Sequence, residues 1–195
     1  IDFENYQKLK NSEIKLKKKE KVFLEDSQYY IEDVRKNIIN ELTYEKVYKQ
    51  GFNINTPINL DLQKIATESL RSGLINYDRR KGWRGILANI SYKKDWFKDF
   101  EKYSLEKSIG WKISIVTKVN QFNAEIETQD NIKGLIEYKD ISWTKKEFEE
   151  LLKPGDLIYT KNLKDNKFSL EQVPKINGGI VVMDPYTGRV FALSG

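Results

Sequence analysis

The feature that most constrains the fold is a change of hydrophobic period near the middle of the chain. Up to residue 80, apolar residues recur at helical spacing. Beyond residue 110 they form short alternating or β-branched runs, which Asn, Asp, Gly and Pro separate. The change predicts a mixed α+β chain in which helices precede a separate, strand-rich part.

Two helices are predicted before the change. The first covers about 28–43, and its apolar stripe consists of Tyr30, Ile31, Val34, Ile38, Ile39 and Leu42. Gly51 breaks that pattern, and the alternation over 52–56 predicts a short strand that ends at Pro57. The second helix is expected to begin after an N-cap at Asp61 and to stop within DRRKGWRG, residues 78–85. Its predicted apolar face consists of Leu62, Ile65, Ala66, Leu70, Leu74 and Tyr77.

Five strand-like runs follow, over 111–119, 122–128, 132–138, 156–163 and 167–173. A short helix is predicted within 144–153, between the third and fourth runs, where Pro154 and Gly155 close it. Five strands with one intervening helix predict a small β-barrel of the oligonucleotide/oligosaccharide-binding (OB) kind.

The last 18 residues, GGIVVMDPYTGRVFALSG, predict a β-hairpin. Pro185 fixes φ at the first turn position, and Gly188 can adopt positive φ. Both runs are apolar nearly throughout, which predicts strands buried on both faces, in a larger sheet that this chain does not contain.

Three passages resemble the bifunctional class A penicillin-binding proteins of type 1A. GFNINTPINLDLQKIATESLRSGLINYDRRKGWRG resembles a strand, TTLD, helix and DRRxGxRG passage of that family. GGIVVMDPYTGRVFALSG resembles the hairpin that opens the transpeptidase core, and YYIEDVRKNIINEL resembles the helix that joins the glycosyltransferase domain to it. One departure is that Pro57-Ile58-Asn59 separates Thr56 from Leu60-Asp61, which puts the predicted strand edge in doubt.

The resemblance implies four parts: a charged linker (1–26), inter-domain helices with a transpeptidase-edge strand (27–85), an inserted OB-like domain (86–174) and the first transpeptidase hairpin (175–195). It implies a parent that polymerises glycan strands and cross-links them by D-Ala-D-Ala transpeptidation. That parent would work on the periplasmic side of the bacterial inner membrane, anchored by an N-terminal membrane helix outside this chain. The expected role here is a non-catalytic docking segment. Its expected partners are the parent's two catalytic domains, and cell-wall regulatory proteins or peptidoglycan.

No catalytic group is expected in this chain, and no cofactor or metal. It has neither Cys nor His, which excludes thiolate or imidazole ligands and bases. A serine transpeptidase needs Ser-x-x-Lys together with Ser-x-Asn and Lys-Thr-Gly, and the last two do not occur. Ser-x-x-Lys itself occurs at chance frequency in a lysine-rich chain, at Ser12/Lys15, Ser91/Lys94, Ser104/Lys107 and Ser142/Lys145.

Seven residues are candidates for hinge or docking contacts: Arg79, Arg80, Lys81, Trp83, Arg84, Trp111 and Trp143. The first five form the densest basic and aromatic cluster of the chain. They could grip a phosphate or a glycan, but a clamp at the end of the second helix is favoured, since cations there complement the helix dipole. The last two could stack on sugars or bases, although a core or hinge-filling role is favoured.

The alternative is a free-standing OB protein that binds single-stranded nucleic acid. A net charge of +5 and a pI near 9.1 favour it. However, only six of the 34 basic residues are arginines, and the lysines are dispersed along the chain. Such dispersion predicts a solvated surface without specific nucleic-acid binding. No membrane contact is expected, because no run approaches the roughly 18 to 20 apolar residues of a membrane helix.

Overall fold

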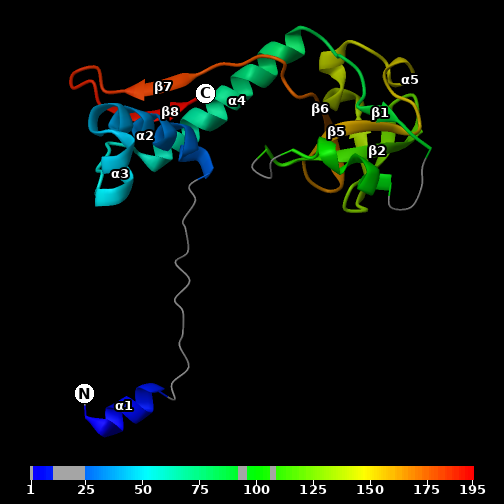
Figure 1. The fold of residues 1–195 in the computed structure, drawn as a ribbon. Coiled ribbons are helices and arrows are strands. Elements are labelled where there is room, and N and C mark those ends of the chain that lie inside the picture. The colour runs from blue at the N-terminus through cyan, green and yellow to red at the C-terminus, as the bar shows by residue number, and fades with distance from the viewer. Residues whose placement is uncertain (1, 11–24, 92–95, 106–108) are drawn as a thin grey trace.

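The computed structural model describes residues 2–10, 25–91, 96–105 and 109–195. One part, here called the helix–hairpin unit, contains α2 (Gln28–Leu42), α3 (Tyr44–Gln50), α4 (Leu60–Arg80), β7 (Ile180–Met183) and β8 (Val190–Ser194). The other part is a barrel, and α4 runs from the hairpin toward it (Figure 1). The fold is therefore mixed α+β, as the change of period predicts.

Helices α2 and α4 confirm the two predicted helices, but their faces differ in detail. Ile31 and Ile65 are 54% and 57% exposed, so neither belongs to the covered stripe. The N-cap of α4 is Asn59 and not Asp61, because the Asn59 side chain accepts a hydrogen bond from the Leu62 amide at 3.0 Å. Tyr77 is also exposed.

The segment between these helices differs from the prediction. Residues 44–50 form the additional helix α3, and the strand predicted over 52–56 is absent from the described chain. No strand of the described residues pairs with this segment. Just before α4, the Asn59 amide donates to the Phe191 carbonyl oxygen of β8 at 2.9 Å.

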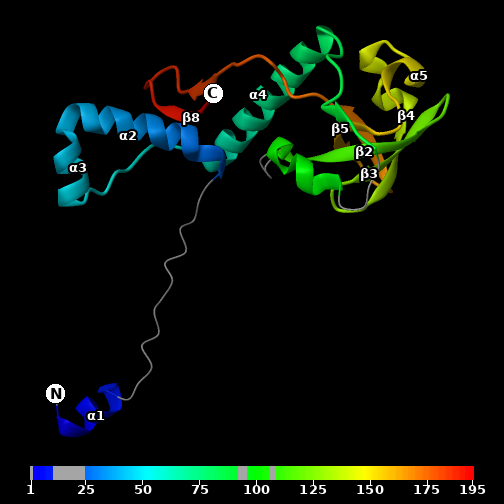
Figure 2. The ribbon, with the colours of Figure 1, turned by 45° about the vertical axis from the view of Figure 1, so that its right-hand side comes forward.

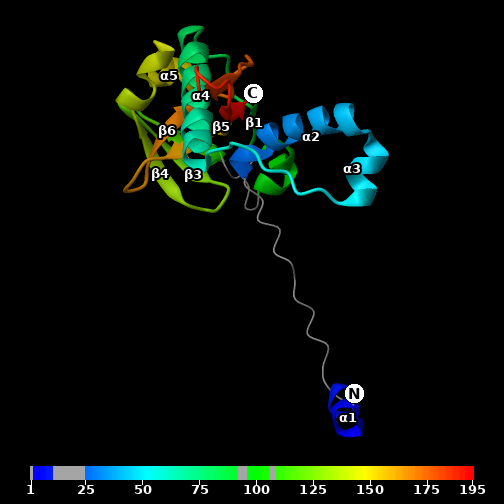
Figure 3. The same ribbon diagram turned by 90° about the vertical axis from the view of Figure 1, so that its left-hand side faces the viewer.

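Two side chains join the helices to β8. Gln63, 1% exposed, donates to the Leu193 carbonyl at 3.0 Å and accepts from the Leu193 amide at 2.9 Å. Its amide thus replaces a missing strand at that edge of β8. The Tyr30 hydroxyl donates to the Val190 carbonyl at 2.9 Å. The hairpin, α2 and α4 consequently form one packed body, seen from two further directions in Figures 2 and 3.

The barrel is closed by five strands: β2 (Trp111–Val119), β3 (Asn123–Thr128), β4 (Lys133–Glu137), β5 (Asp156–Asn162) and β6 (Lys167–Glu171). Neighbouring strands are antiparallel except β4 and β6, which pair in parallel, and β5 pairs with both β2 and β6. A short strand β1 (Ala88–Asn89) pairs antiparallel with the first two residues of β5, Asp156 and Leu157. The five-stranded OB-like barrel predicted from the sequence is confirmed.

The helix inserted between β4 and β5 is shorter than the predicted 144–153. It consists of α5 (Phe148–Leu151), which follows the 3₁₀ turns η4 (Tyr138–Asp140) and η5 (Ser142–Thr144). Lys145 adopts φ 59°, a left-handed conformation that interrupts any continuous helix from Thr144. Phe148 and Leu152 are buried and seal one end of the barrel core.

The barrel has an inner and an outer apolar cluster. Inside, Phe168, Ile126, Ile136 and Ile158 are fully buried. Outside, Ile113 and Ile115 of β2 pack beneath the 3₁₀ helix η2 (Trp96–Tyr103) together with Trp96. Residues 113–116 of β2 are therefore buried on both faces, and η2 covers this part of the barrel wall.

The terminal hairpin forms as predicted, but within this chain it is covered on one face. β7 and β8 pair antiparallel against α4, while Val181 and Met183 are 55% and 54% exposed. The turn has Gly188 at φ 72°, and the Asp184 carboxylate accepts from the Tyr186 amide at 3.0 Å. Burial of the other face in a larger sheet involves residues outside this chain and stays a prediction.

The charged N-terminal stretch contains a short helix, α1 (Phe3–Lys10), which the prediction of a plain linker over 1–26 did not include. Residues 11–24 lie outside the described part of the chain, and so do the apolar positions between Ile14 and Leu24. Among the described helices, none has the length and apolar character needed to cross a membrane.

Candidate functional site

The two crossings between the helix–hairpin unit and the barrel meet around one buried carboxylate. The incoming segment is residues 78–85 and the outgoing segment is residues 172–176. Asp78, 2% exposed, accepts two hydrogen bonds of 2.7 Å from Arg84 Nη1 and one of 2.8 Å from Gln172 Nε2. The Lys175 amide donates to the same carboxylate at 3.2 Å. One side chain thereby holds both crossings.

Further hydrogen bonds bind the two segments directly to each other. The Arg84 amide donates to Gln172 Oε1 at 2.8 Å, and Gln172 Nε2 also donates to the Gly82 carbonyl at 3.2 Å. Arg84 Nη2 donates to the Val173 carbonyl at 2.5 Å. Because the guanidinium bonds to both segments, rotation of one against the other would break several charge-assisted bonds at once.

A second set of contacts joins the end of α4 to the barrel wall. Arg79 pairs with Glu171 of β6 at 2.7 Å, and Glu171 is buried. The Arg79 guanidinium also lies 5.2 Å from the centre of the Trp143 ring. Trp83 packs edge-on against Trp143, with ring centroids 5.8 Å apart. Cation–π and edge-to-face contacts of this kind stabilise a docked arrangement beyond their buried area.

The structure brings four of the seven predicted residues together: Arg79, Trp83, Arg84 and Trp143. Arg80 and Lys81 lie over the ring of Tyr77 on the exposed side of the helix end, at 5.3 and 5.4 Å from its centre. Trp111 lies elsewhere, on a cavity between α4 and β2. The prediction missed Asp78, Glu171 and Gln172. Asp78 could have been found from the sequence, because it is the acidic residue at the start of the basic passage DRRKGWRG.

The electrostatics of the junction favour an ionised Asp78. Burial by itself raises the pKa of this carboxyl, but hydrogen bonds from Gln172, Arg84 and the Lys175 amide, with the Arg84 charge, outweigh it. The pKa of Asp78 therefore lies below its ordinary value. Within the described ranges, no cluster of three or more acidic residues is placed to hold a metal ion.

This lowered pKa predicts a junction that weakens in acid. An acid whose folded pKa is lowered stabilises the fold fully above its unfolded pKa, about 3.9, and loses that contribution as pH falls through the folded value. The free energy of unfolding of the wild-type chain should exceed that of Asp78→Asn near neutral pH, and the difference should shrink below about pH 4. Urea titrations at several pH values measure it. A difference that persists unchanged into strong acid would contradict this assignment.

Comparison with known proteins places this architecture in one class. Residues 83–176 match the family described as the penicillin-binding protein OB-like domain. The chain is 35% identical over 190 residues to penicillin-binding protein 1A of Rickettsia bellii and 24% identical over 185 residues to that of Pseudomonas aeruginosa. These alignments cover 95% and 87% of this chain, but only 24% and 22% of the two relatives.

A crystal structure of penicillin-binding protein 1A from Haemophilus influenzae has the same fold over all of this chain, with a TM-score of 0.68 and 23% identity, and the match covers 29% of that protein. The chain belongs to the penicillin-binding protein 1A family and contains its OB-like domain. The family resemblance seen in the sequence is confirmed. The free-standing nucleic-acid-binding alternative is not favoured by these matches.

Proposed function

We propose that this chain is an accessory segment of a peptidoglycan synthase, in which the barrel is a docking platform held at a fixed angle to the transpeptidase. The observation that supports it most is the buried Asp78 carboxylate, which binds the incoming and outgoing segments together. A domain inserted through two short, cross-linked tethers has little orientational freedom to begin with. It therefore loses far less of it when held in one orientation than a domain on one flexible linker does. A partner on the barrel could then bias the transpeptidase mechanically.

The helix–hairpin unit is the other side of this arrangement. In the proposal, β7 and β8 are the first hairpin of the transpeptidase, and α2 leads to them from the glycosyltransferase domain. The exposed Val181 and Met183 side chains would be covered by the rest of that sheet. The proposed domain limits are 27–85, 86–174 and 175–195.

The parent's chemistry belongs to the same proposal. We infer glycan-strand polymerisation and D-Ala-D-Ala transpeptidation by catalytic domains that this chain does not contain, on the periplasmic side of the inner membrane. The relatives' name, penicillin-binding protein 1A, supports this assignment. Proposed partners are those catalytic domains and, at the barrel, a cell-wall regulatory protein or peptidoglycan.

Replacing both Trp83 and Arg84 with Ala tests the fixed angle. Arg84 supplies the bonds between the segments, and Trp83 packs on Trp143. The barrel should stay folded, because its inner core lies in the strands and Trp83 contacts only its margin. Residual dipolar couplings should then show that the barrel and the helix–hairpin unit no longer share one alignment tensor.

The matched control for that test is Arg80→Ala with Lys81→Ala, which alters neighbouring residues whose side chains lie over the Tyr77 ring. It should leave the alignment unchanged. The fixed-platform proposal fails if the Trp83/Arg84 variant keeps the wild-type geometry, or if the wild type already tumbles as two independent bodies.

A fluorescent penicillin should not label this chain covalently. Of the four Ser-x-x-Lys pairs, only Ser142/Lys145 has both residues in the described ranges, and both side chains are exposed. The Ser142 hydroxyl donates to the Lys139 carbonyl at 2.9 Å, and the exposed Ser142/Lys145 pair lies in no enclosed site where a serine nucleophile would be activated. Denaturing electrophoresis after incubation is the measurement, and stoichiometric labelling would refute the non-catalytic assignment.

A further inference from the structure

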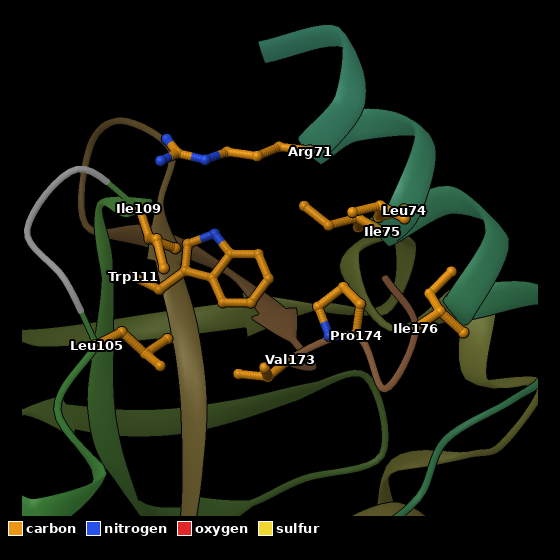
Figure 4. A pocket seen from close by; sticks show the side chains of 9 residues that line it. All are labelled: Arg71, Leu74, Ile75, Leu105, Ile109, Trp111, Val173, Pro174 and Ile176. Carbon is orange, nitrogen blue, oxygen red and sulfur yellow. The ribbon is translucent and has the colours of Figure 1, made fainter. Parts of the chain in front are cut away.

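A cavity lies between α4 and the barrel, beside the outgoing segment (Figure 4). Its walls come from three parts of the fold, and six of the side chains are Leu74, Ile75, Trp111, Val173, Pro174 and Ile176. Figure 4 shows the Trp111 and Pro174 rings on opposite sides of the same space, with Ile75 directed toward it from the helix. Val173, whose carbonyl accepts from Arg84 at the Asp78 junction, also lines this cavity.

The chemistry of the cavity is apolar. Apart from Arg71, every lining residue is aliphatic, aromatic or proline, and the volume is about 210 Å³. An apolar cavity of about 150 Å³ excludes water and binds benzene, so this one has room for a single ring of benzene to indole size. The flat Trp111 indole offers such a ring a stacking surface.

A second cavity of about 340 Å³ adjoins the first, since Leu105 and Val173 line both. Its walls include the polar side chains of Glu171, Gln172 and Lys175. An apolar recess beside a small number of polar groups, at the boundary of two structural units, is the usual composition of a small-ligand site.

We propose that the Trp111 cavity binds a small amphipathic ligand through one aromatic ring, with the ligand's polar end directed toward the adjoining cavity. The ring would contact α4, β2 and the outgoing segment together. Binding therefore favours the docked arrangement of the barrel over any detached one, by the difference in affinity between the two. This site requires no macromolecular partner on the barrel, but it rests on the barrel being docked against α4, as the proposed function does.

Indole is the probe for the ring site, titrated into the ¹⁵N-labelled chain of 195 residues. The indole N–H signal of Trp111, assigned with Trp111→Phe, should shift in a saturable manner. With about nine non-hydrogen atoms in the probe, even poor ligand efficiency gives a Kd of about 10 mM or lower. The signal of Trp96, which packs with Ile113 and Ile115 and does not line the cavity, should not move.

Ile75→Phe fills the cavity from the α4 side and should abolish the saturable shift. The matched control is Ile65→Phe on the same helix, where the side chain is 57% exposed and binding should persist. If Ile75→Phe fails to fold, Leu105→Trp fills the space from the other wall. No saturable shift in the wild type, or an equal shift in a folded filling variant, would overturn the proposal. The measurement needs no partner on the barrel, so it distinguishes failure of ring binding from failure of the docking role wherever the barrel is still held against α4.

Discussion

Replacing Asp78 with Ala is expected to lower the free energy of unfolding by about 2–3 kcal/mol and to detach the barrel from α4. The carboxylate is buried and accepts hydrogen bonds from Arg84, Gln172 and the Lys175 amide. Its removal takes one of two acceptors from the buried Gln172 amide, and it leaves Nη1 of the Arg84 guanidinium without the carboxylate that accepts from it. The effect stays below that of a fully buried pair because the Arg84 side chain is 28% exposed and water can replace part of the lost interaction.

Urea denaturation followed by tryptophan fluorescence measures the stability loss, and residual dipolar couplings measure the release of the barrel. Glu68→Ala is the control, since Glu68 lies on the exposed side of the same helix and should change stability by no more than about 0.5 kcal/mol. Equal stability of the two variants would show that the junction does not depend on the Asp78 carboxylate.

The barrel could be predicted from the sequence because its signals are local. Strand β2 matches the predicted run 111–119 residue for residue, since β-branched alternation lies between turn-forming residues. The positions of α2 and α4 could be predicted for the same reason. The strand predicted at 52–56 failed because pairing is not local: an extended segment becomes a strand only beside a partner, and the described chain supplies none.

Which residues of the helices are buried was harder to predict than where the helices lie. Ile65 and Tyr77 follow the helical period of α4, yet its buried residues are Gln63, Ala66, Thr67 and Asp78. Gln63 and Asp78 are buried because they have hydrogen-bond partners from distant parts of the chain. Gln63, for example, bonds to Leu193, which is 130 residues away.

The candidate site shows the same division between local and distant signals. The cluster at 79–84 stood out because five basic and aromatic residues lie close together in the sequence. The acceptors that give it a structural role did not, because Gln172 is 94 residues from Asp78 and Glu171 is 92 from Arg79. A clamp was favoured on helix-dipole grounds, whereas the observed contacts are mainly specific hydrogen bonds to the outgoing segment and to β6.

Both apolar core clusters found among the described residues lie in the barrel, and neither includes a buried residue of the helix–hairpin unit, which predicts that the barrel can be unfolded without that unit. Phe168 is fully buried at the parallel pair of β4 and β6 that closes the barrel. A Cβ on Gly134 would lie only 2.3 Å from its ring, so the two strands are closely packed there.

Phe168→Ala is therefore expected to cost about 3–5 kcal/mol, a large fraction of the stability of a small domain. Amide signals of 111–171 should lose their dispersion at moderate temperature, while those of α2, α4 and the hairpin persist, because Gln63 and Tyr30 hold that unit together without the barrel. Phe122→Ala is the matched control: that side chain is 71% exposed, and its loss should change stability by no more than about 0.5 kcal/mol. Simultaneous loss of the helix–hairpin signals would show that the two parts fold as a single cooperative unit. The junction would then lie inside one domain and would not connect two.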